Sequence, residues 1–313
     1  KKMKRYITLF LAFALLSACE YKEEAIFKKE ASDRTSTTLD TYKKIIESYD
    51  GYWLLSYYPG VSRSFGGFPV APRSIGGYSF VLKLKDGKVK ASSEVRPTNA
   101  EEESYYTYSN TEGPTLSFDT FNSVLDHFRF VSPVFTNARG GDIEFIFLKE
   151  ENGVLTLRGR TSNNLMTLTK LTSDREAFLN KLRENTQVLK GKGLSPITIQ
   201  GTEVKLTHFP SYRQLVFSYE GQTLQRAFSL TEKGIKLYEP AEIKGITFDE
   251  LYFNEDKTAL TTPDGAISTA LAPCPITFST TSSRWITVGE YYASQSYIDI
   301  HRDLDNQVRR RSE

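Results

Sequence analysis

Apolar and polar residues alternate along the first half of the chain, as they do in strands that bury one face. The clearest run extends from Tyr78 to Lys85, and its aromatic and leucine residues fall on one side. Asp86-Gly87 follows and predicts a tight hairpin turn into 88–95, because both residues tolerate positive φ. A second such pair is Asn152-Gly153. Similar runs occupy 143–148, 154–160 and 165–171. The pattern predicts an antiparallel β domain over residues 37–172.

The second half of the chain repeats this pattern with shorter runs. Glu220-Gly221, Lys233-Gly234 and Pro240 separate them. The predicted strands are 212–219, 223–230, 234–238, 243–248 and 251–253. Short, regularly spaced strands with Gly and Pro turns are typical of antiparallel sandwiches and barrels rather than of alternating βαβ units. The predicted fold class is mainly β, with two antiparallel β domains, sandwich or barrel-like, and a few short helices.

Helical spacing appears at three places. The first, over 39–49, predicts a helix that Ser36 or Thr37 caps. The second, over 173–192, begins with a capping-box pattern at Ser173 and Glu176 and predicts a linker helix. The third begins at Glu290 and predicts a terminal helix. We therefore expect a tether at 19–36, an N-terminal β domain at 37–172, the linker helix, and a C-terminal β domain at 193–313.

The first 18 residues have the pattern of a secretory signal peptide. Basic residues precede an apolar run of roughly ten residues, about half of what a membrane-spanning helix needs. The run ends in Leu-Ser-Ala-Cys, which resembles the lipobox of bacterial lipoproteins and predicts acylation of Cys19 as the new N-terminus. Lys22-Glu23-Glu24 resembles the surface-export signal of Bacteroidota-type lipoproteins, and a solvated charged tether is the alternative. We expect a lipid-anchored, surface-exposed protein of the outer membrane.

The net charge limits the possible partners, and the cysteine content limits disulfide formation and thiol chemistry. The first 18 residues carry four basic and no acidic residues, so removing them lowers the net charge from +2 to −2. A nearly neutral chain argues against nucleic acid as a partner. With Cys19 acylated, Cys274 is the remaining thiol and has no cysteine to pair with. Its Pro-flanked setting supplies no base, which favours a buried structural cysteine over a nucleophile.

The sequence offers no recognisable catalytic or metal motif. His127, His208 and His301 lie far apart and outside any metal-ligand array. Nucleophile-elbow, phosphate-loop and dinucleotide fingerprints are absent. We therefore predict no catalytic residue, no metal and no cofactor. A spatially assembled carboxylate pair among the 38 acidic residues stays open, because glycosidase spacing cannot be seen in a sequence.

Two clusters of acidic residues are candidate cation sites. Asp142 and Glu144 alternate in one strand beside Gly140-Gly141, so both point the same way and could hold a cation. An exposed strand face is the favoured interpretation, because the pair supplies too few oxygens for Ca²⁺. Asp299, Asp303 and Asp305 share a helical face that fits a solvated surface better than a metal site.

Aromatic residues are abundant, with 18 Tyr, 20 Phe and 2 Trp. Core and cross-strand packing is their default role in β proteins. Adjacent aromatics such as Tyr52-Trp53 and Tyr57-Tyr58 must face opposite ways on a strand, so exposed rings for stacking on sugars or apolar ligands are the alternative. The candidate ligand-binding residues are Trp53, Tyr57, Tyr78, Asp119, Asn122, Asp142 and Glu144.

Four stretches combine Gly with aromatic and small polar residues. They are Gly51-Tyr52-Trp53-Leu54 to Tyr58, Gly76-Gly77-Tyr78-Ser79-Phe80, 113–122 and Gly140-Gly141-Asp142-Ile143-Glu144-Phe145. Together they resemble the DUF4302 family of uncharacterised Bacteroidota surface lipoproteins. The resemblance implies an outer-membrane setting, often beside genes for SusC/SusD-type nutrient uptake, and no known reaction. Within 113–122, Asp119, Thr120 and Asn122 favour a loop-fixing role. The alternative is that this loop and Gly140-Gly141 line a ligand mouth.

These observations lead to a first hypothesis and two alternatives. We expect a non-enzymatic binding or accessory component of a SusC/SusD-like nutrient-acquisition system. Its partners would be the membrane, through the lipid on Cys19, outer-membrane SusC/SusD-like proteins, and a glycan or peptide ligand. A surface glycan- or peptide-processing hydrolase with a carboxylate site is the first alternative. A structural or adhesive surface protein that recognises its partner through a flat patch is the second.

Overall fold

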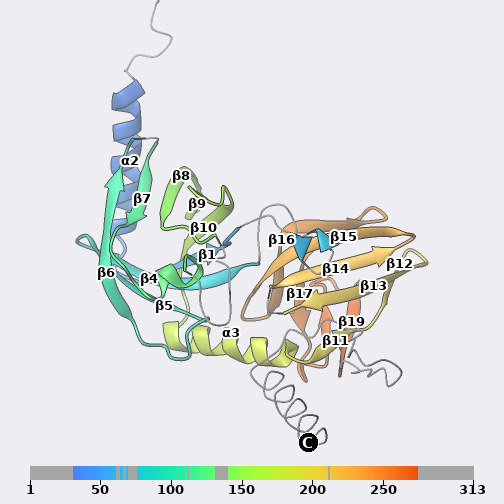
Figure 1. Cartoon of the computed structure of the whole chain (residues 1–313). Coiled ribbons are helices and arrows are strands. Elements are labelled where there is room, and N and C mark those ends of the chain that lie inside the picture. Colours follow the sequence, from blue (N-terminus) through green and yellow to red (C-terminus); the bar gives the residue numbers. More distant parts are fainter. Residues whose placement is uncertain are drawn as a thin grey trace, which may run out of the picture.

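The structure is a computed structural model that describes residues 31–60, 64–65, 68–69, 76–111, 113–130, 140–210 and 212–273. Figure 1 shows a β-barrel and a second, curled sheet side by side, with helix α3 (Arg175–Leu189) running below them. Both sheets are antiparallel, and the predicted mainly β fold with two antiparallel units is confirmed. The first unit is a closed barrel rather than a sandwich.

Eight strands close the barrel in the order β1-β10-β9-β8-β7-β6-β5-β4. Strand β1 completes the circle by pairing with β4 on one side and β10 on the other. A separate ribbon pairs β2 (Ser64–Phe65) with β3 (Phe68–Pro69). The barrel strands are β1 (Trp53–Tyr57), β4 (Tyr78–Lys85), β5 (Lys88–Ser93), β6 (Glu102–Ser109), β7 (Thr115–Phe118), β8 (Glu144–Glu151), β9 (Val154–Gly159) and β10 (Leu165–Lys170).

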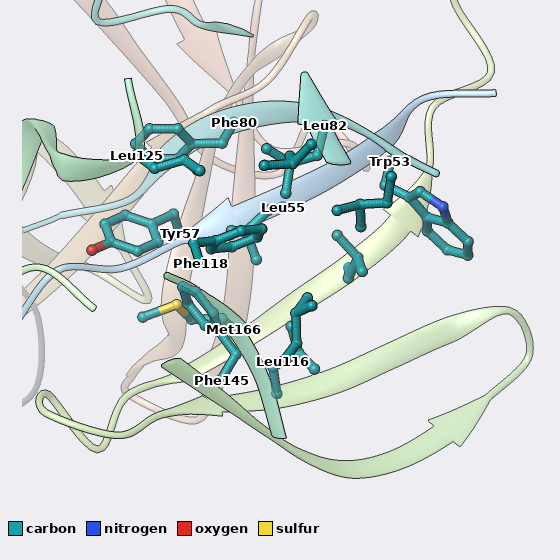
Figure 2. Close-up of a cluster of buried hydrophobic side chains, with 14 of the residues drawn as sticks. Trp53, Leu55, Tyr57, Phe80, Leu82, Leu116, Phe118, Leu125, Phe145 and Met166 are labelled. Carbon is teal, nitrogen blue, oxygen red and sulfur yellow. The ribbon is translucent and has the colours of Figure 1, made fainter. Parts of the chain in front are cut away.

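Side chains fill the barrel interior. Figure 2 shows the inward residues of several strands meeting in one cluster, with Tyr57 at its left edge and Trp53 at its right. Helix α2 (Ala31–Glu47) adds Tyr42, which stacks on Phe147, and the short helix η1 (Leu125–Phe128) adds Phe128. Strict alternation produces this core, because every second residue of a barrel strand faces inward.

The two predicted hairpin turns of the barrel are confirmed. Asp86 and Gly87 have φ of 51° and 74°, and Asn152 and Gly153 have φ of 53° and 79°. Positive φ at both central residues is the requirement of a type I′ turn. These turns set the β4–β5 and β8–β9 registers.

The second sheet has nine strands in the order β11-β19-β18-β17-β16-β15-β14-β13-β12. Its apolar face packs on α3 and forms a core of leucine, isoleucine and phenylalanine, separate from that of the barrel. The strands are β11 (Lys192–Leu194), β12 (Ile197–Ile199), β13 (Thr202–Phe209), β14 (Gln214–Tyr219), β15 (Gln222–Leu230), β16 (Gly234–Ile243), β17 (Ile246–Phe253), β18 (Ala259–Thr261) and β19 (Ser268–Pro273).

Two predicted strand boundaries are wrong here, and one strand was not predicted. The predicted strand 243–248 spans a turn, because Lys244 and Gly245 have φ of 53° and 77°. Strand β16 instead continues through Pro240, where the register with β17 shifts, and such an irregularity is where a strand tolerates proline. Strand β13 was not predicted, although its alternation buries Val204, Leu206 and His208.

The helices also differ at their ends. Asp174, rather than Ser173, caps α3, and its carboxylate accepts a hydrogen bond from the Ala177 N–H. Helix α2 begins at Ala31, ahead of the predicted caps. Within the described ranges, no helix is both long and apolar enough to cross a bilayer. The predictions for Cys19, Cys274, His301, the aspartates at 299, 303 and 305 and the terminal helix lie outside the described residues.

Candidate ligand-binding site

The barrel and the second sheet meet closely at a glycine pair. The Gly77 N–H donates a hydrogen bond to the Phe228 carbonyl at 2.9 Å. A Cβ at Gly77 would lie 2.5 Å from Tyr58 Cε1 and 2.6 Å from Ser229 Cβ. At Gly76, where φ is 129°, a Cβ would lie 2.5 Å from Arg213 Cβ. Two glycines are therefore required for the two units to approach this closely.

A buried ion pair joins the barrel and the second sheet beside this glycine pair. Arg213 of the second sheet lies 2.7 Å from Glu94, which follows β5, and their side chains are 7% and 1% exposed. The guanidinium also donates to the Gly77 carbonyl and lies 4.2 Å from the Tyr78 ring centroid. Burial alone would lower the pKa of Arg213, but the Glu94 carboxylate raises it above its ordinary value. We call Gly76, Gly77, Glu94 and Arg213 the clamp.

Beside the clamp, the two units stand apart and enclose a pocket of about 570 Å³. The outer wall of barrel strands β1, β4, β9 and β10 forms one side, and β15, β16 and the turn between them form the other. Phe178 of α3 contributes to the lining. This volume lies within the roughly 300–1,000 Å³ of small-molecule sites, which often occur at domain interfaces.

Hydroxyl groups dominate the lining of this pocket. Nine of its seventeen lining residues are serine, threonine or tyrosine. The barrel contributes them because the apolar residues of each strand face inward, which leaves the alternate residues on the outer wall. Leucines and Phe178 supply apolar surface between them. Such a lining offers both donors and acceptors.

Two tyrosines join the walls of the pocket. The Tyr58 hydroxyl donates to Ser229 Oγ at 3.2 Å, and the Tyr58 ring lies 4.4 Å from that of Tyr238. The Leu165 N–H donates to the Tyr238 hydroxyl at 2.9 Å. Burial raises the pKa of Tyr58 to about 12, so its hydroxyl stays protonated at neutral pH. These contacts connect β1 and β10 to β15 and β16.

The pocket carries little charge of its own. Lys236 and Glu232 are the charged residues of the lining. The Lys236 ammonium lies 3.0 Å from Glu250 and 3.7 Å from Asp249 on β17, so its charge is already paired. Burial alone would lower the pKa of Lys236, but Glu250 raises it. Among the residues described, no group of three His, Cys, Asp or Glu side chains could hold a metal ion.

A family model matches residues 23–255 and is described as a domain of unknown function, DUF4302. The chain belongs to the DUF4302 family. The match extends beyond the four stretches recognised in the sequence and runs through the barrel, the clamp and both walls of the pocket. No curated protein and no solved structure matches the chain.

In this DUF4302 protein, the candidate aromatic residues face the barrel interior. Trp53, Tyr57 and Tyr78 are 1%, 2% and 5% exposed and belong to the barrel core. Tyr57 further exchanges hydrogen bonds with the backbone of Asp142. This placement supports the default packing role, and none of the three lines the pocket.

The candidate residues of the 113–122 stretch stabilise a loop. Asn122 is fully buried, its amide donates to the Glu102 carbonyl and Ser104 Oγ, and its side-chain oxygen accepts from two backbone N–H groups. Asp119 is exposed and accepts a hydrogen bond from Thr107 Oγ1. The predicted loop-fixing role is confirmed for Asn122.

Asp142 and Glu144 are engaged separately. Asp142 is 2% exposed, and its carboxylate accepts backbone hydrogen bonds from Thr161 and Ser162. Glu144 lies 3.4 Å from Arg160. The Asp142 carboxylate therefore fixes a turn of the barrel, and the preferred exposed-face interpretation does not apply to it.

Sequence reasoning missed the residues that do line the pocket. Ser56, Thr156 and Thr167 look like the solvent face of half-buried strands, and only the docking of the second sheet covers them. Tyr58 is the one lining residue that the sequence pattern indicated. Adjacent residues of a strand face opposite sides, so with Tyr57 in the barrel interior the Tyr58 ring lies outside it.

Proposed function

We propose that this protein captures a small ligand in the pocket between its barrel and its second sheet, as a lipid-anchored component of a nutrient-acquisition system at the bacterial surface. The pocket of about 570 Å³, lined by hydroxyl and aromatic groups, is the observation that carries the proposal. The predicted role as a binding or accessory component beside SusC/SusD-like proteins fits such a capture site.

The anchoring part of the proposal rests on the sequence. The Leu-Ser-Ala-Cys pattern ending at Cys19 and the charged residues after it support attachment to the outer membrane through acyl chains. A tether at 19–36 would then separate the barrel from the membrane surface. This arrangement would position a capture site outside the cell, where nutrients arrive.

The lining favours binding over hydrolysis. Glycoside hydrolysis uses two carboxylates on opposite sides of the scissile bond. Among the lining residues that the structure describes, Glu232 is the one carboxylate. The hydrolase alternative would need a second acid from elsewhere, whereas ligand capture needs only the groups present.

A thermal-shift screen with glycans, peptides, haem and metal ions tests the capture function. A ligand that binds the native state raises the melting temperature by mass action. We expect a shift with one ligand class in the wild-type protein and its loss in Thr167→Trp, which fills the pocket. A shift that persists in Thr167→Trp, or no shift with any class, would contradict capture at this site.

The anchor is tested by membrane fractionation. We expect Cys19→Ala to move the protein from the membrane to the soluble fraction. Cys274→Ala is the matched control, because it removes the other of the two cysteines and should leave the protein with the membrane. Retention of Cys19→Ala on the membrane would refute lipid anchoring.

A further inference from the structure

One wall of the pocket carries hydroxyl side chains in a continuous row. Ser56 of β1 pairs in register with Ser79 of β4 on one side and with Thr167 of β10 on the other. Thr167 in turn pairs with Thr156 of β9. Directly paired residues lie on the same face of a sheet. Ser79, Ser56, Thr167 and Thr156 therefore form what we call the hydroxyl row, across four adjacent strands.

The hydroxyl row faces the pocket, not the barrel core. In every strand its member stands between two core residues, as Thr167 does between Met166 and Leu168. All four members line the pocket. Adjacent strands lie about 4.8 Å apart, so the row extends over roughly 14 Å. A row of this length can contact several groups of one extended ligand.

The hydroxyls of the row are available for such contacts. The side chains of all four members make no hydrogen bond to the described part of the chain. None of their hydroxyl oxygens is among the fully buried polar atoms that lack a partner. In Ser79 the backbone N–H donates a hydrogen bond to the Glu94 carboxylate, whereas the side-chain hydroxyl remains available to a ligand in the pocket. Each hydroxyl can donate one hydrogen bond and accept others.

The next row of the same wall has a different character. Val81 of β4 pairs with Leu54 of β1, and Leu54 pairs with Thr169 of β10. Val81 is fully buried and Leu54 partly so, and both pack against the core of the second sheet. Val81 and Leu54 therefore form an apolar stretch beside the hydroxyl row; Leu54 and Thr169 also line the pocket, whereas Val81 does not.

The opposite wall adds aromatic and apolar surface, and Glu232, exposed in the turn between β15 and β16, is the one carboxylate among the described lining residues. Tyr238 lies there with Leu237, and the Lys236 charge is paired with β17 carboxylates. A ligand that matches both walls has many hydroxyls, an apolar face and no net charge. Peptides and ionic ligands lack this combination, because their charges would find no unpaired partner on the hydroxyl row.

We propose that the hydroxyl row recognises a neutral saccharide, with its sugar hydroxyls on the row and its apolar face toward Tyr238 and Leu237. This assignment rests on the proposed capture function and specifies its ligand class. Sites that hydrogen-bond a ligand hydroxyl discriminate strongly against analogues that lack it.

Isothermal titration calorimetry with maltose, cellobiose and lactose, compared with glucuronic acid, glucosamine and a neutral tripeptide, tests the proposal. We expect at least one neutral disaccharide to bind more tightly than the charged sugars and the tripeptide. Thr167→Val keeps the shape of the side chain but removes the hydroxyl, and should weaken binding by roughly three- to tenfold. Thr207→Val, on an exposed position of β13, is the matched control and should bind like the wild type.

The outcomes separate the ligand class from the capture function. Equal saccharide affinity in Thr167→Val and Thr207→Val would overturn the role of the hydroxyl row. Binding of only charged sugars or the tripeptide, abolished by Thr167→Trp, would overturn the saccharide assignment and leave capture intact. Absence of binding by these probes, together with a negative thermal-shift screen, would overturn both. Equal urea midpoints of the two valine variants would show that altered binding does not reflect lost folding.

Discussion

Two parts of the interface between the barrel and the second sheet differ sharply in how closely the two units approach. At the clamp, backbones touch through Gly76-Gly77, and the charges of Glu94 and Arg213 neutralise each other out of water. Along the hydroxyl row the same barrel wall leaves its side chains without a hydrogen-bond partner among the described residues. Contact concentrated at the clamp therefore allows the neighbouring surfaces to stand apart and stay polar.

The largest expected effect comes from breaking the clamp. Glu94→Ala leaves the Arg213 charge buried and unpaired, and should lower the free energy of unfolding by about 3–5 kcal/mol. Urea unfolding measures this loss. A double variant, Glu94→Leu with Arg213→Met, removes both charges and should recover most of the stability. A double variant as unstable as Glu94→Ala would show that shape rather than charge holds the clamp.

A smaller effect is expected from closing the space between the backbones. Gly77→Ala places a methyl group 2.5 Å from Tyr58 Cε1, and such overpacking costs about 1–3 kcal/mol. Because Tyr58 also lines the pocket, ligand binding should weaken in the same variant. Gly153→Ala is the comparison, since its Cβ meets nothing within 4 Å and its cost comes only from a φ of +79°. Equal binding by Gly77→Ala and the wild type would argue that the clamp does not set the pocket.

The contrast also shows what the sequence could predict. Local patterns determine local structure, so the alternation of 78–85 and the Asp86-Gly87 turn were enough to predict β4 and its hairpin. Glu94 and Arg213 are 119 positions apart, and nothing local distinguishes them from exposed charges. The hydroxyl row requires strand register, which pairs Ser56 with Thr167 across 111 positions of sequence. The pocket was therefore not predictable, because its walls are defined only when the two units dock.

The stability of the protein should depend on pH through His208, which lies outside the interface. His208 of β13 is buried beside the Leu189 carbonyl at 3.2 Å. Burial lowers the pKa of His208 below its ordinary 6.5, although the Leu189 hydrogen bond partly offsets this. As pH falls through 6.5 the unfolded chain takes up a proton that the folded chain resists, so stability falls until the lowered folded pKa is passed.

Urea midpoints measured between about pH 7.5 and 5.5 test this expectation. The wild type should lose stability across the range, and His208→Gln, which keeps an amide donor but does not titrate, should lose less. The neutral-pH stability of the variant serves as its own reference. Identical slopes for both proteins would place the acid sensitivity elsewhere in the protein.

The smallest expected effect is on the stability of the hydroxyl row. Because the Thr167 hydroxyl has no hydrogen-bond partner in the part of the chain that the structure describes, Thr167→Val should change the free energy of unfolding by no more than about 0.5 kcal/mol, unlike any variant of the clamp. Urea unfolding measures this difference beside the exposed control Thr207→Val. A loss above about 1 kcal/mol would mean that the hydroxyl stabilises the fold, since that is the net worth of one intramolecular hydrogen bond. Little change in stability together with weaker saccharide binding would instead identify a side chain that serves the ligand and not the fold.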